Sequence, residues 1–62
     1  MSNQQTKSVL SQIIALSFQL NKTEYYLQAA KDLGYDTMIV NYTFRVNFLQ
    51  IQIKELTNQF AA

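Results

Sequence analysis

The chain has one glycine, Gly34, and no proline, so its strongest break falls near the middle of 62 residues. Glycine takes the left-handed conformation that closes a helix with little strain. Asp36 follows two residues later and suits the N-cap of a new helix. We therefore expect two helical arms joined by a tight turn at residues 34–36.

Beyond the turn, apolar residues recur at alternating spacings of three and four. This spacing is typical of the apolar seam of a coiled-coil-like helix pair. It predicts a second helix over about residues 37–60, roughly 36 Å long at about 1.5 Å per residue. The seam residues are Ile39, Tyr42, Val46, Leu49, Ile53, Leu56 and Phe60.

Residues 40–48 also fit a β-strand. They alternate apolar and polar side chains, and their β-branched and aromatic content is common in half-buried strands. However, no turn residue follows for a return strand, and one strand alone is not stable. The alternation also changes phase between Phe48 and Leu49. We favour the helix.

The first arm, about residues 8–33, follows an expected N-terminal tail over about residues 1–6. Its apolar residues recur at spacings of three, four and seven, which again indicates one apolar helix face. The pattern loosens near Asn21, where residues 21–24 resemble a capping box. We favour a break there, which gives a hairpin of three helices, over one kinked helix, which gives a hairpin of two. The apolar residues are Val9, Ile13, Leu16, Leu20, Leu27 and Ala30.

The predicted fold is therefore a single all-α domain, an antiparallel helical hairpin that associates into a helical bundle. A chain this short buries only about 60% of the surface that its unfolded form exposes. Cysteine and histidine are absent, which excludes disulfides and the usual structural zinc sites. Oligomerisation or unusually good helix packing must supply the missing stability.

A second apolar group supports oligomerisation. At about 100° per residue, it lies nearly opposite the seam of the second helix, and the first arm repeats the arrangement. Exposed apolar patches usually mark interaction surfaces, and two hairpins would form a four-helix bundle. The alternative is a three-helix monomer that covers both faces itself. The expected oligomer interface is Ile14, Phe18, Val40, Phe44, Phe48 and Ile51.

Catalytic equipment is sparse. Histidine and cysteine, the commonest base and the best thiol nucleophile, are missing, and the carboxylates are Glu24, Asp32, Asp36 and Glu55. Helix capping and solvent exposure explain these carboxylates, which also lack the spacing of a bridged metal centre. We expect a protein that is not an enzyme and has no metal or cofactor.

Charge patterning does not single out a partner. The net charge is +1, and the lysines point to different sides of the first arm. An RNA-binding hairpin dimer is one alternative function, although the basic stripe that RNA binding needs is missing. Another is an oligomer that sequesters a small anionic ligand at a subunit interface. The residues expected to contact a ligand or partner are Lys22, Tyr25, Tyr26, Tyr42 and Arg45.

The apolar stretches are far shorter than the roughly 20 residues of a spanning helix, and the N-terminus is a poor secretory signal. We expect a soluble, cytoplasmic protein. The favoured function is that of a non-catalytic homo-oligomer that binds another protein as an adaptor, inhibitor or regulator. Binding would occur by helix-to-helix packing through apolar anchors.

Overall fold

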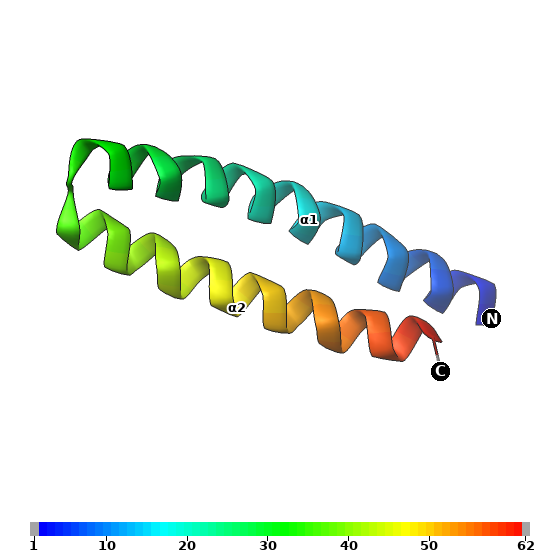
Figure 1. Ribbon diagram of the computed structural model, residues 1–62. Coiled ribbons are helices and arrows are strands. Elements are labelled where there is room, and N and C mark those ends of the chain that lie inside the picture. Colours follow the sequence, from blue (N-terminus) through cyan, green and yellow to red (C-terminus); the bar gives the residue numbers. More distant parts are fainter. Residues whose placement is uncertain (1, 62) are drawn as a thin grey trace.

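The protein is a helical hairpin. A computed structural model describes the backbone of residues 2–61 and the side chains of residues 7–61. Helix α1 (Ser2–Leu33) runs antiparallel to helix α2 (Asp36–Ala61), and both chain ends lie opposite the turn (Figure 1). The molecule measures 49 × 14 × 12 Å, so it is a rod one helix pair thick. The predicted all-α hairpin is confirmed.

The turn closes α1 with a Schellman motif. Gly34 has a φ of 73°, and its N–H donates to the carbonyl of Lys31 at 3.2 Å. The N–H of Tyr35 donates to the carbonyl of Ala30 at 3.0 Å. The carbonyl of Tyr35 in turn accepts the N–H of Ile39 at 2.9 Å, which makes Tyr35 the N-cap of α2. The prediction of Asp36 as N-cap is thus wrong by one residue, because Asp36 is the first helical residue.

Helix α1 is continuous, so the predicted break near Asn21 is wrong. Asn21, the expected N-cap, lies inside α1, and the neighbouring Thr23 also fits a helix interior. Its Oγ1 donates to the carbonyl of Gln19 at 2.7 Å within the same helix, and only 7% of the residue is exposed. α1 also reaches back to Ser2, where a tail to residue 6 was expected. Gln4 and Gln5 of this segment favour a helix, whereas Ser2, Asn3 and Thr6 are weaker helix formers.

The strand alternative for residues 40–48 is wrong, since the whole segment lies within α2. Thr43, a residue that strands favour, fits the helix by donating its hydroxyl to the carbonyl of Ile39 at 2.6 Å. The preference for a helix from the three-four spacing is therefore confirmed.

The core is one row of side chains between the two helices, which we call the inner seam. Its best-buried members are Thr23 and Ala30 on α1 and Val46 and Leu49 on α2. The other seam residues are half-buried, except Phe60, which is exposed near the chain end. The seam predicted from the spacing is the one observed, with Thr23 filling the place between Leu20 and Leu27.

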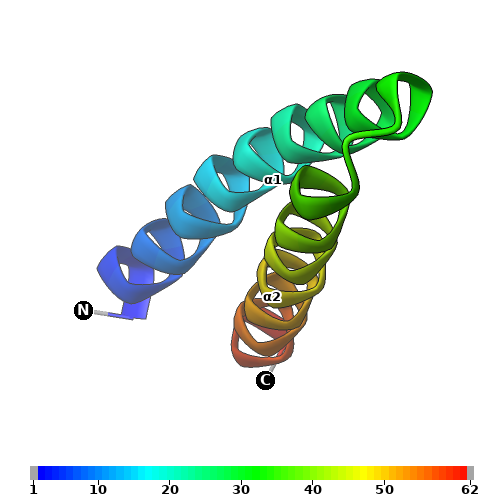
Figure 2. The same ribbon diagram turned by 90° about the vertical axis from the view of Figure 1, so that its left-hand side faces the viewer.

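The helices diverge with distance from the turn (Figure 2). Near the turn, α1 contributes the small residue Ala30, which is 3% exposed. Farther out, leucine and isoleucine occupy the seam on both helices. Since the distance between packed helices depends on the side chains at the contact, this change in size accounts for the divergence.

Candidate interaction surfaces

The first candidate surface lies on α2, on the side turned away from α1. We call Val40, Phe44, Phe48 and Ile51 the α2 outer face, and every one of them is more than half exposed. A shallow depression on this face is lined by Phe44, Phe48 and Ile51 together with Arg45 and Asn47. These side chains follow the spacing of four, four and three that keeps them on one helix face.

The second candidate surface is its counterpart on α1. Ile14, Phe18 and Tyr25 lie opposite the seam of α1, and we call them the α1 outer face. Phe18 is 72% exposed and Tyr25 is 73% exposed. Aromatic side chains with this much exposed surface are typical anchors of an interface.

The two outer faces point in opposite directions. Each face lies roughly 150–170° from the seam of its own helix at about 100° per residue, and the two seams face each other. A line across the rod therefore passes from the α1 outer face through the inner seam to the α2 outer face. All six residues expected in the oligomer interface are exposed on one or the other of these faces.

A third feature is a cluster of aromatic rings on one flank of the hairpin, near the turn. The rings of Tyr26 and Tyr42 lie 6.0 Å apart across the helix pair, and Tyr25 packs edge-on against Tyr26, also at 6.0 Å. The Nζ of Lys22 lies 5.9 Å from the centre of the Tyr26 ring, within range of a cation–π contact. A depression beside Tyr26 and Tyr42 is lined further by Ala29, Ala30, Leu33, Tyr35 and Met38. We call its exposed part, Tyr26, Leu33, Tyr35 and Met38, the tyrosine flank.

The structure therefore brings together four of the five residues expected to contact a ligand or partner. Arg45 is the exception, because it borders the depression on the α2 outer face. It lies beside Phe44 and Phe48, where its aliphatic stem can cover apolar surface.

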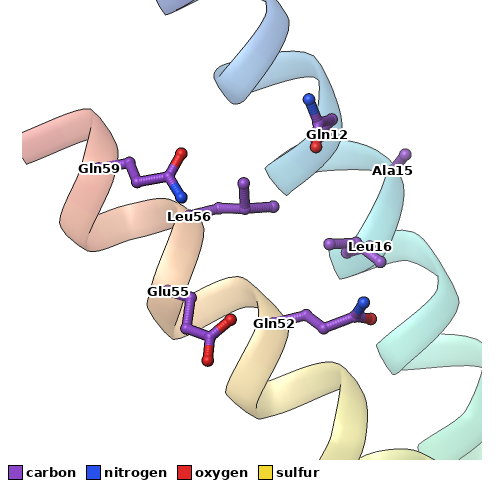
Figure 3. Close-up of a pocket in the computed structure, with 7 residues that line it drawn as sticks. All are labelled: Gln12, Ala15, Leu16, Gln52, Glu55, Leu56 and Gln59. Carbon is purple, nitrogen blue, oxygen red and sulfur yellow. The ribbon is translucent and has the colours of Figure 1, made fainter.

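A groove opens between the helices at the end away from the turn, with a volume of about 370 Å³. Leu16 and Leu56 point toward one another across it, and Gln52 extends from α2 toward α1 (Figure 3). Gln12, at its edge, donates from Nε2 to the hydroxyl of Ser8 at 3.3 Å. This groove opens because the helices diverge. The spacing of apolar residues in the sequence is regular along the whole seam, so it does not predict the groove.

No group of three or more metal-binding side chains gathers among the described residues. Asp32 accepts a hydrogen bond from the amide of Gln28 at 3.0 Å, an ordinary contact along the helix surface. Among the described side chains, no buried nitrogen or oxygen lacks a hydrogen-bond partner.

The described stretch of either helix is also too polar to cross a membrane. Comparison of the chain with protein-family models, with curated proteins and with solved structures gives no match.

Tyr25 was expected to contact a ligand, and its place on the α1 outer face was overlooked. The sequence holds the indication, since Tyr25 follows Phe18 by seven residues and so lies on the same side of a continuous helix. The expected break near Asn21 hid this relationship.

Proposed function

We propose that the chain is a non-catalytic, homo-oligomeric helical protein that binds another protein and acts as an adaptor, inhibitor or regulator. The observation that carries the proposal is the α2 outer face, where four large apolar residues in a row are each more than half exposed. A monomer rarely leaves such a row in water, because burying each side chain contributes about 1.5–3 kcal/mol.

The total surface supports self-association. The chain exposes 5067 Å². A compact protein of its mass, 7.2 kDa, exposes about 4,100 Å². Its radius of gyration, 14.4 Å, exceeds the roughly 11 Å of a compact domain of this length. A second copy is a partner that is always present and that offers the same apolar faces.

The tyrosine flank is the surface that we assign to the other protein. It lies between the two outer faces around the rod, so it stays accessible when copies associate through those faces. Its aromatic and aliphatic side chains suit the apolar side of an amphipathic helix. Tyr26 and Tyr35 add hydroxyl groups that hydrogen-bond at the rim of such a contact.

The test of self-association is Phe48→Glu, followed by sedimentation equilibrium. A charge placed on the α2 outer face should raise the dissociation constant by at least tenfold, since about 1.4 kcal/mol corresponds to a factor of ten. Gln50→Glu is the matched control, because Gln50 is exposed on the same helix but outside that face. Equal masses for wild type, Phe48→Glu and Gln50→Glu would remove the proposal.

The test of partner binding is affinity capture by the wild type and by a Tyr26→Ser, Leu33→Ser double variant. The double variant should lose the partner that the wild type and Gln50→Glu both retain. A partner retained by all three chains would show that the tyrosine flank is not its binding site.

A second candidate function rests on the cation–π contact of Lys22 with Tyr26. Lys22 lies beside the Tyr26 ring, which packs against Tyr25 and Tyr42. A cation among tyrosines suits a small anionic ligand at a subunit interface. Sequestration predicts that one anionic compound from a screen raises the melting temperature of the wild type by mass action. Lys22→Gln should abolish that gain, and a screen without any gain would discard this candidate.

A further inference from the structure

The opposite directions of the outer faces decide which assemblies the chain can form. In a dimer with twofold symmetry, the same patch of both copies meets. Such a dimer would cover either the α1 outer face or the α2 outer face and leave the other in water. The uncovered face would still present an aromatic ring that is more than two-thirds exposed, either Phe18 at 72% or Phe44 at 71%.

The two outer faces also carry apolar side chains at matching heights along the rod. Phe18 precedes Gly34 by 16 residues, and Ile51 follows Tyr35 by 16 residues. Tyr25 and Phe44 are each nine residues from the same turn. Because both helices rise about 1.5 Å per residue and run antiparallel, the members of each pair lie at about the same height. They are on opposite sides of the rod.

We infer that copies of this chain stack side by side in a row, with the α2 outer face of each copy against the α1 outer face of the next. The inference rests on the self-association proposed above and specifies its geometry. A copy displaced sideways without rotation would bring Phe44 opposite Tyr25 of its neighbour and Ile51 opposite Phe18. The neighbouring helices then run antiparallel, in the arrangement that α1 and α2 already adopt within one chain.

This contact is head-to-tail, so it leaves one free face of each kind at the two ends of a row. Each added copy covers one free face and presents another, so the row continues to lengthen. The chain exposes 5067 Å², about 900 Å² more than a compact protein of its mass, and this excess corresponds to about one contact per copy. A standard interface buries about 800 Å² per partner. The net charge of +1 gives little repulsion between copies.

The test uses two variants that each block one face. Phe44→Glu with Phe48→Glu blocks the α2 outer face, and Phe18→Glu with Tyr25→Glu blocks the α1 outer face. The row predicts that each variant alone sediments as a monomer. An equal mixture should form a dimer of one copy of each, because one variant keeps the α1 outer face and the other keeps the α2 outer face. Circular dichroism checks that both variants stay helical.

The outcomes separate this inference from the proposal beneath it. If the α1-blocked variant dimerises on its own, copies meet α2 to α2, which overturns the row and leaves self-association intact. A mixture of two helical variants that stays monomeric also overturns the row. A wild type that is monomeric at all concentrations overturns both statements.

Cysteine cross-linking covers the case in which a blocked variant loses its helices. The natural chain has no cysteine, so Phe18→Cys and Ile51→Cys each introduce a single thiol. The row predicts that oxidation links the two chains in a mixture, because residues 18 and 51 of neighbouring copies face each other. Each variant alone should remain almost free of dimers. Ile51→Cys dimers formed in preference to the mixed disulfide would overturn the inference.

Discussion

The rings of Tyr26 and Tyr42 lie 6.0 Å apart with an interplanar angle of 30°, so one aromatic contact joins α1 to α2 near the turn. Aromatic pairs at this separation contribute about 0.5–1.5 kcal/mol beyond the area that they bury. A double-mutant cycle with Tyr26→Leu and Tyr42→Leu should give a coupling energy in that range. Urea unfolding at a fixed protein concentration measures it, and a cycle of Tyr25→Leu with Tyr42→Leu is the control. Equal coupling energies in the two cycles would contradict a specific contact between Tyr26 and Tyr42.

The second prediction concerns the left-handed turn residue. Gly34 has a φ of 73°, and an added Cβ would meet no atom within 4 Å. Gly34→Ala should therefore lower the free energy of unfolding through backbone strain alone, by about 1–2 kcal/mol. Gly34→Asn should lower it less, because asparagine tolerates this conformation better. Urea unfolding of the three chains would refute the assignment if the alanine variant were as stable as the wild type.

The third prediction distinguishes a continuous α1 from two helices joined at Asn21. In a continuous helix, Asn21→Ala replaces an exposed residue by the best helix former and should stabilise the protein by up to about 0.7 kcal/mol. At a helix break with Asn21 as N-cap, the same change would destabilise it by about 0.5–2 kcal/mol. Ser11→Ala, at another exposed α1 position, is the control for helix propensity. The sign of the change at Asn21 decides between the two structures.

Much of the fold could be predicted from the sequence because its determinants are local. Gly34 marks the turn, and the three-four spacing through Val46 and Leu49 fixes the seam of α2 without knowledge of α1. The break near Asn21 is predicted because residues 21–24 match a capping box, but Asn21 lies inside the continuous α1. Thr23 fits a helix interior because its hydroxyl bonds to the carbonyl four residues back. The spacing from Leu20 to Leu27 leaves one seam place open, and Thr23 fills it.

The surfaces were harder to predict because they depend on how the two helices meet. The apolar character of Phe44 and Phe48 was evident from their spacing. That the α1 outer face points the opposite way follows only once the seams of both helices are known to face each other. The groove beside Leu16 and Leu56 depends on the divergence of the helices, which the seam periodicity alone does not specify. The four-helix bundle stays a prediction, and the directions of the outer faces favour a row.

Sedimentation equilibrium of the wild-type chain over a wide concentration range tests the central claim most directly. Helices that are apolar on opposite sides should draw copies together, so the weight-average mass should rise with concentration beyond that of two 7.2 kDa chains. A helical protein that stays at 7.2 kDa throughout, with its outer faces in water, would contradict the account.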